Sequence, residues 1–160
     1  MKSTITEDEL IKETLSSAKT IAMVGVSSIK KEESSNIKRR PSIIVMKYLQ
    51  EFGYRVIPVN PFSAGKKIYG ETVVTKLEDV DLPIDIVDVF RPSNEASGLA
   101  EQAVRIGAKV FWLQYGIQSD EAKKIVKSKN ITYISNKCIK QEYQRLFLKI
   151  SPVFPVLKTN

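Results

Sequence analysis

A glycine and two serines follow the first apolar segment of the chain in an arrangement that suits a negatively charged ligand. The short run of apolar residues that ends in Gly25 and Val26 is followed directly by Ser27 and Ser28. Glycine lets the backbone approach a phosphate closely, and serine hydroxyls donate hydrogen bonds. We interpret this turn as an anion site, although a glycine needed only for tight packing would have the same sequence.

Basic residues accompany this turn and a later strand end. Arg40 closes a Lys-Arg-Arg run directly before Pro41, where a helix is predicted to begin and to point its N-terminus at the same place. Cations there can hold phosphates that backbone donors alone leave unneutralised, but a solvated basic run has the same composition. Arg91 follows an apolar strand, where it can reach a ligand or pair with Asp88 or Glu95.

The side chains that most often catalyse reactions are scarce. The chain has no histidine and one cysteine, Cys138, which removes imidazole acid–base chemistry, most zinc sites and any intramolecular disulfide. Asp85 and Asp88 flank one strand, where hydrogen bonding at a strand edge explains them better than acid–base work. Trp112 and Cys138 are expected to pack in the core. We assign no catalytic and no metal-binding residue.

Composition indicates one soluble, moderately basic domain. The 160 residues are 42% hydrophobic and carry 25 Lys and Arg against 18 Asp and Glu, a net charge of +7. This charge attracts polyanions, phosphorylated cofactors or an acidic partner, and part of it is expected to be a solvated face. No stretch approaches the roughly 18 apolar residues of a membrane helix, and the first residues are too polar for a signal peptide. We expect a cytoplasmic protein.

Strand and helix patterns alternate along the chain. Apolar runs predict strands at 20–26, 54–59, 85–90, 109–114 and 131–135. A Thr6-x-x-Glu9 capping box opens a first helix, and apolar periodicity predicts helices at 41–52, 94–106, 119–129 and 140–149. Residues 27–40 are expected to be a loop, and 62–82 to hold only a short helix near 75–80. The alternation predicts an α/β fold in which helices cover both faces of a doubly wound five-stranded parallel sheet.

The helix predicted from Pro41 has one apolar stripe, formed by Ile44, Val45, Tyr48, Leu49 and Phe52.

Over the whole chain we expect an N-terminal helix at 1–18 that packs on the domain, a ligand-binding domain at 19–150 and an extended C-terminal tail at 151–160.

Ligands of such sheets bind outside the carboxyl ends of the strands. The candidates are therefore the residues that follow each strand: Gly25, Val26, Ser27 and Ser28, then Asn60 and Pro61, then Phe90 and Arg91, then Gln114, Tyr115, Gly116 and Ile117, and finally 136–138.

Several of these motifs together resemble one family, the small stand-alone CoA-binding domain proteins related to the nucleotide-binding domain of the succinyl-CoA synthetase α subunit. The resemblance runs from about Lys19 to Leu146. It is carried by Val24–Ser27, Arg40–Ser42, Val45, Tyr48-Leu49, Gly53–Pro61, Asp85–Arg91, Val110–Ile117 and Cys138-Ile139 with Glu142. It implies a Rossmann-like single domain that holds coenzyme A across the carboxyl edge of its sheet.

The resemblance also implies a role for each candidate. Gly25, Val26, Ser27 and Ser28 would lie near the pyrophosphate, with Arg40 as a phosphate cation beside Pro41 and Ser42. Asn60 and Pro61 would flank the adenosine end, and Phe90 and Arg91 would line the pocket. Gln114, Tyr115, Gly116 and Ile117 would lie toward the pantetheine arm.

The sequence departs from the family pattern at two places and ends before a third feature. Residues 28–39 replace a shorter proline-containing stretch, and Tyr143 stands where a histidine is usual. The second domain, which carries the phosphorylated histidine of the synthetases, is not part of this sequence. The resemblance therefore carries over the binding of CoA or an acyl-CoA but not ligase activity.

Two other classes of function stay open. An NAD(P)-binding protein or oxidoreductase shares the fold but requires G-x-G-x-x-G and an acidic residue after the second strand, where Asn60 stands. A nucleic-acid-binding domain has only the net charge in its favour.

A further hypothesis is that Cys138 forms a mixed disulfide with the thiol of bound CoA under oxidation. The sequence leaves oligomerisation open.

Overall fold

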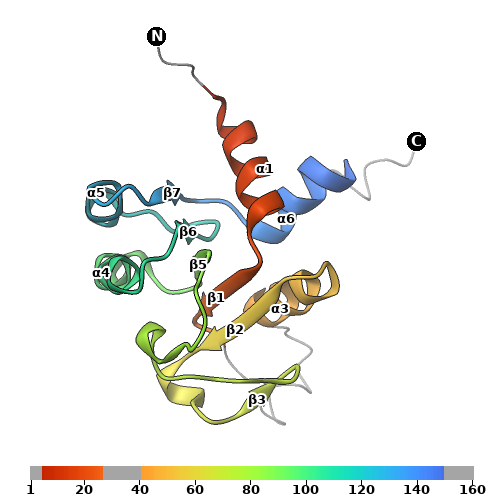
Figure 1. The fold of residues 1–160 in the computed structure, drawn as a ribbon, viewed down its shortest axis with the longest axis vertical. Coiled ribbons are helices and arrows are strands. Elements are labelled where there is room, and N and C mark those ends of the chain that lie inside the picture. Colours follow the sequence, from red (N-terminus) through yellow and green to blue (C-terminus); the bar gives the residue numbers. More distant parts are fainter. Residues whose placement is uncertain (1–4, 27–40, 150–160) are drawn as a thin grey trace.

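Five parallel strands form the centre of the molecule. A computed structural model describes residues 5–26 and 41–149, and within them the strands are β1 (Thr20–Val24), β2 (Arg55–Val59), β5 (Ile86–Val89), β6 (Val110–Leu113) and β7 (Thr132–Ile134). Their order across the sheet is β2-β1-β5-β6-β7 (Figure 1). The predicted doubly wound, Rossmann-like α/β fold is confirmed, and every strand lies within its predicted range.

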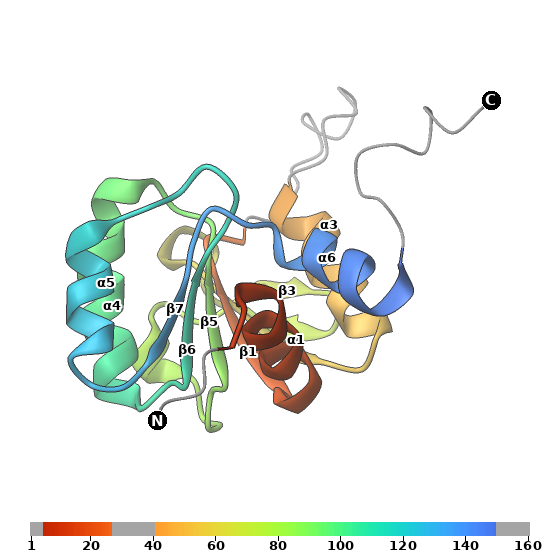
Figure 2. The same ribbon diagram turned by 90° about the horizontal axis from the view of Figure 1, so that it is seen from above.

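Helices cover both faces of this sheet, as Figure 2 shows from above. On one side lie α1 (Glu7–Ser17), α3 (Pro41–Glu51) and α6 (Ile139–Tyr143), and on the other lie α4 (Ala96–Ile106) and α5 (Asp120–Lys127). Successive residues of each strand point to opposite faces of the sheet. Met23 and Ile86 pack in the apolar cluster on the side of α1, α3 and α6, whereas Ala22 and Val87 pack in the cluster on the side of α4 and α5. The continuous apolar runs in the sequence follow from this burial on both faces.

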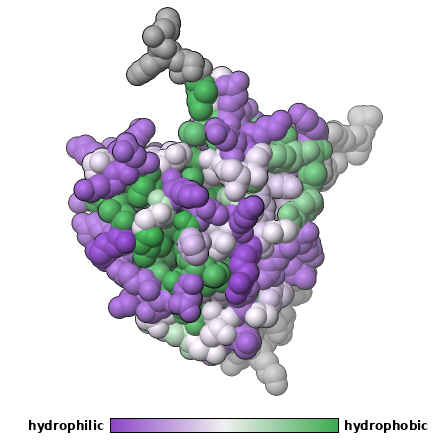
Figure 3. Space-filling view, in the orientation of Figure 1, coloured by the Kyte–Doolittle hydropathy of each residue, from purple (hydrophilic) through white to green (hydrophobic). Residues whose placement is uncertain are grey.

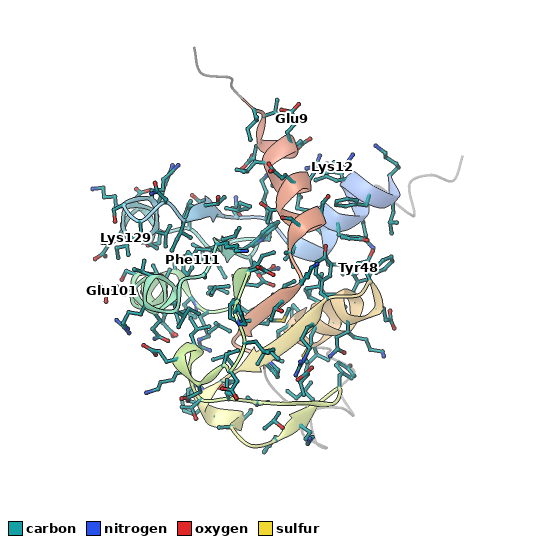
Figure 4. The ribbon with its side chains drawn as sticks, viewed as in Figure 1. Glu9, Lys12, Tyr48, Glu101, Phe111 and Lys129 are labelled. Atoms are coloured by element: carbon teal, nitrogen blue, oxygen red, sulfur yellow. The ribbon has the colours of Figure 1, made fainter. Side chains whose placement is uncertain are left out.

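Side chains in Figure 4 follow this layering. Phe111 of β6 is fully buried and lies between the sheet and helices α4 and α5, whereas Glu101 and Lys129 are exposed on the outer side of those helices. On the surface drawn in Figure 3, hydrophilic side chains predominate, and a hydrophobic patch lies in the region between α4 and β1. None of the helices within residues 5–26 and 41–149 has the length and apolar character needed to cross a membrane.

The capping box that the sequence predicts at the start of the first helix is present, and further contacts hold this helix to the domain. The Thr6 hydroxyl accepts a hydrogen bond from the Glu9 amide at 3.0 Å, and the Glu9 carboxylate accepts one from the Thr6 amide at 2.9 Å. Near its last turn, the Leu15 carbonyl accepts a hydrogen bond from the Tyr54 hydroxyl. Arg145 also joins α1 to the C-terminal helix, because its guanidinium contacts the Asp8 carboxylate. The N-terminal helix therefore packs on the domain.

The connection from β2 to β5 differs most from the prediction. It contains a 3₁₀ turn η1 (Pro61–Ser63), a short antiparallel hairpin of β3 (Lys67–Ile68) and β4 (Glu71–Thr72), and a second 3₁₀ turn η2 (Leu77–Asp79). The helix expected near 75–80 is thus a single turn. Its one buried residue, Leu77, offers too little apolar surface to stabilise a longer helix.

The apolar stripe predicted on α3 is partly wrong. Ile44 and Phe52 are exposed, at 37% and 41%, while Ile43 and Met46 are buried. Because the helix packs between the sheet and α6, its buried face is wider than one stripe and is rotated toward Ile43.

The ends of the remaining helices also differ in detail from the predictions. A 3₁₀ turn η3 (Ser93–Glu95) precedes α4, and α6 continues into a π-helical turn η4 (Gln144–Leu148) rather than one long helix. The predicted loop at 27–40 and tail at 151–160 lie outside the described residues.

Candidate functional site

The carboxyl ends of β1 and β5 lie side by side at the point where the chain changes direction across the sheet. The next described helix after β1, α3, covers one face, and the helix after β5, α4, covers the other. In doubly wound sheets this change leaves a crevice between the two strand ends, and ligands bind there. Val24 and Val89 are paired in register, so the residues that follow them emerge together at this edge.

A cavity of about 320 Å³ lies at this edge, within the range of about 300–1,000 Å³ typical of small-molecule sites. It brings together four of the predicted residues, Gly25, Asn60, Pro61 and Arg91. Glu95, which the sequence suggested only as a partner of Arg91, also lines the cavity. Sequence reasoning missed five further side chains of the lining, which are Phe62, Thr75, Lys76, Leu99 and Gln102. Only the position of Phe62, directly after the predicted Asn60 and Pro61, could have indicated any of them.

Gly25 is the residue that lets β1 turn into this cavity. Its φ of +103° is disfavoured for residues with a side chain, and a Cβ atom there would lie 2.7 Å from the Phe90 carbonyl oxygen. Its amide donates to the Val59 carbonyl at 2.8 Å. The glycine is therefore required by the close approach of the β1 and β5 ends, and its amide hydrogen is used within the sheet.

Asn60 joins the ends of β1 and β2. Its side chain is buried, donates from Nδ2 to the Val26 carbonyl at 2.9 Å and accepts from the Phe62 amide at 2.9 Å. An asparagine can do both because its amide carries a donor and an acceptor, whereas an ionised aspartate has only acceptors. Asn60 thereby positions the 3₁₀ turn that carries Phe62 into the cavity wall.

Arg91 forms an ion pair with Glu95. Its Nε and an Nη atom donate to the two carboxylate oxygens at 2.9 and 2.7 Å. This contact raises the pKa of Arg91, and the same contact lowers the pKa of Glu95. Of the partners considered from the sequence, Glu95 is correct and Asp88 is not, because residues three apart on a strand face opposite sides of the sheet. Arg91 lines the cavity while paired.

Other predicted residues lie at the same edge but outside this cavity. Gln114 is buried and accepts from the Ile139 amide at 3.1 Å, and the Gly116 amide donates to Asn136 Oδ1 at 2.7 Å. Between them Tyr115 is 76% exposed. This turn, Gln114–Ile117, is thus fixed against the start of α6, over β6 rather than over β1 and β2.

The first turn of α3 accounts for two more candidates. Pro41 is its first residue and is exposed, while Ser42 is buried. Val26 is fully buried, and Phe90 is half-buried against the α3 side of the core. Cys138 is half-buried at the start of α6 and packs against the same cluster. None of these five residues lines the cavity, and Ser27, Ser28 and Arg40 lie outside the described residues.

Asp88 is an unusual group close to this edge. It is fully buried in β5, opposite Met23 of β1 and Trp112 of β6, and neither carboxylate oxygen has a hydrogen-bond partner within the described part of the chain. Burial alone raises the pKa of this carboxyl well above its ordinary value, because the charged form would lose its hydration without gaining a partner. Asp88 therefore favours its neutral form.

Metal chemistry has no support in the described residues, which contain no group of three or more Cys, Asp and Glu side chains close enough to hold an ion. The fold and its edge cavity instead define a class: a doubly wound, Rossmann-like α/β domain with its ligand crevice at the carboxyl ends of parallel strands.

Comparison with known proteins identifies the family within this class. Residues 19–144 match the CoA binding domain. The uncharacterized protein YneT of Bacillus subtilis strain 168 is 41% identical over 130 residues, which make up 81% of this chain and 89% of YneT. A solved structure from Thermus thermophilus is 37% identical and covers 89% of this chain and 100% of its own, with a TM-score of 0.79.

A more distant structure shares the fold. The dinucleotide-forming acetyl-coenzyme A synthetase 1 of Ca. Korarchaeum cryptofilum is 21% identical over 78% of this chain, with a TM-score of 0.61, and the matched part is 27% of that protein. The chain described here belongs to the CoA-binding domain family. The resemblance noted in the sequence is thus confirmed.

Proposed function

We propose that this protein binds coenzyme A or an acyl-CoA non-covalently at the carboxyl edge of its sheet and catalyses no reaction itself. The observation that carries the proposal is the edge cavity, in which Gly25, Asn60, Pro61 and Arg91 meet within a chain of the CoA-binding domain family. The turn Gln114–Ile117, further along the same edge, is suited to contact the pantetheine arm. We also propose that the protein acts in the cytoplasm.

The polar groups of the edge favour CoA over NAD(P). A dinucleotide-binding domain of the Rossmann type uses an acidic residue after the second strand to bind the ribose hydroxyls. Here that residue is Asn60, whose side chain is occupied by the Val26 carbonyl and the Phe62 amide. The absence of histidine from the whole sequence supports a binding role, because imidazole is the commonest acid–base catalyst.

Isothermal titration calorimetry with CoA, acetyl-CoA, NAD, NADP and ATP tests the proposal directly. We expect binding of CoA or acetyl-CoA to be the tightest of the five. Binding of NAD or NADP alone would replace the proposal with the dinucleotide alternative, and binding of none would refute it.

Arg91→Ala tests whether the cavity is the site. If Arg91 contacts a phosphate, the affinity for CoA should fall about 10- to 150-fold, the equivalent of about 1.5–3 kcal/mol for a charge-assisted contact. The matched control is Arg55→Ala. Arg55 is also paired with a glutamate through two hydrogen bonds, to Glu71 at 2.6 and 3.1 Å, but it begins β2 at the opposite edge of the sheet. Equal losses for the two variants would place the ligand elsewhere.

A further inference from the structure

The edge cavity is small compared with a whole CoA molecule. Its volume of about 320 Å³ is at the lower end of the range of about 300–1,000 Å³ for small-molecule sites. Its wall contains apolar side chains from three elements, Val24 of β1, Val59 of β2 and Leu99 of α4. Gln102 and Thr75 add polar groups to this apolar lining. An apolar space with a few polar groups suits a purine base.

An exposed aromatic ring lies on the wall of this cavity. Phe62 is 86% exposed, the most exposed of the large hydrophobic side chains within the described residues. It is held there by Asn60, because the Asn60 side chain accepts the Phe62 amide hydrogen and fixes the turn. Aromatic side chains that bind nucleotides present a ring face on which a base stacks. Phe62 contributes an exposed aromatic ring of this kind to the cavity wall.

Two cations approach the cavity from opposite sides. Arg91 follows β5 and lies beside Gly25, since a Cβ atom on Gly25 would be 3.0 Å from Arg91 Cδ. Lys76 follows Val74, which pairs with Val59 on the outer edge of β2. The two backbone segments are three strand positions apart, roughly 14 Å at about 4.8 Å per strand. Both side chains line the one cavity.

The two cations differ in their charge balance. Arg91 is neutralised by the Glu95 carboxylate at 2.7 Å. Lys76 has no carboxylate within ion-pair distance among residues 5–26 and 41–149. Arg105 lowers the pKa of the nearby Glu78 carboxyl, and the charge of Lys76 adds a smaller effect in the same direction. The Lys76 side of the cavity is therefore the side that gains from an added anionic group.

The nucleoside end of CoA carries anionic groups at two positions of its ribose. A diphosphate is attached to the 5′ carbon, and a phosphate monoester is attached to the 3′ carbon. A phosphate monoester carries about −1.5 to −2 charges at neutral pH. On the basis of the proposed function, we infer that Lys76 binds the 3′-phosphate while adenine stacks on Phe62 and the diphosphate faces Gly25 and Arg91. Lys76 then determines specificity, because dephospho-CoA and NAD lack that phosphate.

Comparison of CoA with 3′-dephospho-CoA tests this assignment by calorimetry at constant salt concentration. Wild-type protein should bind CoA more tightly than dephospho-CoA. Lys76→Gln should weaken CoA binding about tenfold and leave dephospho-CoA binding unchanged, since a charge-assisted contact is lost only where the phosphate exists. Lys129→Gln is the control for net charge, because Lys129 is exposed on the outer side of the α5 end (Figure 4), and it should change neither affinity.

Phe62→Leu tests the stacking separately. Both ligands contain adenine, so this variant should lose the same factor of about tenfold for CoA and dephospho-CoA. Fluorescence of the buried Trp112 checks that each variant is folded, so that a loss of affinity is not a loss of structure.

The outcomes separate the inference from the proposed function. If wild-type protein binds CoA but Lys76→Gln loses equally for both ligands, or loses nothing, the assignment of Lys76 is wrong and CoA binding stands. If wild-type protein binds neither ligand, the proposed function itself is wrong.

Discussion

Replacement of Asp88 by asparagine should make the stability of this protein less dependent on pH. Asp88 is fully buried in β5, and both of its oxygens lack hydrogen-bond partners among the described residues. Burial raises the pKa of its carboxyl well above the ordinary value of 3.8. The folded protein therefore keeps a proton that the unfolded chain releases at lower pH, and this difference makes folding depend on pH.

The direction and slope follow from proton linkage. Below the ordinary pKa of 3.8 the carboxyl is protonated in both states, so its contribution to stability is complete. As the pH rises above that value, the free energy of unfolding falls by about 1.4 kcal/mol per pH unit, until the pH passes the raised pKa of the folded state. Asparagine does not titrate, so Asp88→Asn lacks this slope. Its own unpartnered amide adds only a cost that is the same at every pH.

Urea denaturation followed by tryptophan fluorescence measures the effect. Trp112 is the only tryptophan and lies opposite Asp88 in the sheet register, so it reports on the same part of the core. The free energy of unfolding of wild type, minus that of Asp88→Asn, should fall as the pH rises above the ordinary pKa of 3.8, and it should level off once the pH passes the raised pKa of the folded state. A difference that is constant, or that rises with pH, would refute the reasoning.

Asp85→Asn is the matched control at the other end of the same strand. Burial raises the pKa of Asp85, but hydrogen bonds from the Lys19 and Thr20 amides, at 2.7 and 3.1 Å, and the charge of Lys109 outweigh it and lower the pKa overall. The stability that Asp85 contributes is therefore present at pH values above the pKa of its carboxyl in the unfolded chain. It is lost as the pH falls through the lowered pKa of the same carboxyl in the folded protein. Its wild-type-minus-variant difference should have the opposite slope and lie at more acidic pH.

Three more substitutions test single contacts. Gly25→Ala should cost at least about 1–3 kcal/mol, because its Cβ would lie 2.7 Å from the Phe90 carbonyl oxygen, and should abolish CoA binding in calorimetry; an unchanged melting temperature would contradict this. Tyr54→Phe removes the donor to the Leu15 carbonyl and should cost about 0.5–1.5 kcal/mol in urea denaturation. Leu49→Ala empties a fully buried site under α3 and should cost about 2–5 kcal/mol, so that a loss well below this range would mean that α3 packs differently.

Much of the architecture was predictable from local sequence. Each of the five strands lies within a predicted apolar run, because a strand covered on both faces must be apolar at consecutive positions. The capping groups Thr6 and Ser119 were also predictable, since a hydroxyl that accepts an amide three residues later depends on neighbours in the chain alone. The sequence further determined that no histidine lies at the strand ends, because the chain contains none.

The composition of the cavity was decided only by the tertiary structure. Lys76, Leu99 and Gln102 come from segments that no local pattern connects, and they meet because β1 lies between β2 and β5 in the folded sheet. Asp88 is buried with no hydrogen-bond partner among residues 5–26 and 41–149, and this burial likewise depends on which helices cover that face, a long-range property of the packed core. Sequence determines which residues can lie in a strand or cap a helix, whereas contacts between distant segments depend on the order of the strands and the packing of the layers, and these determine the shape and charge of the site.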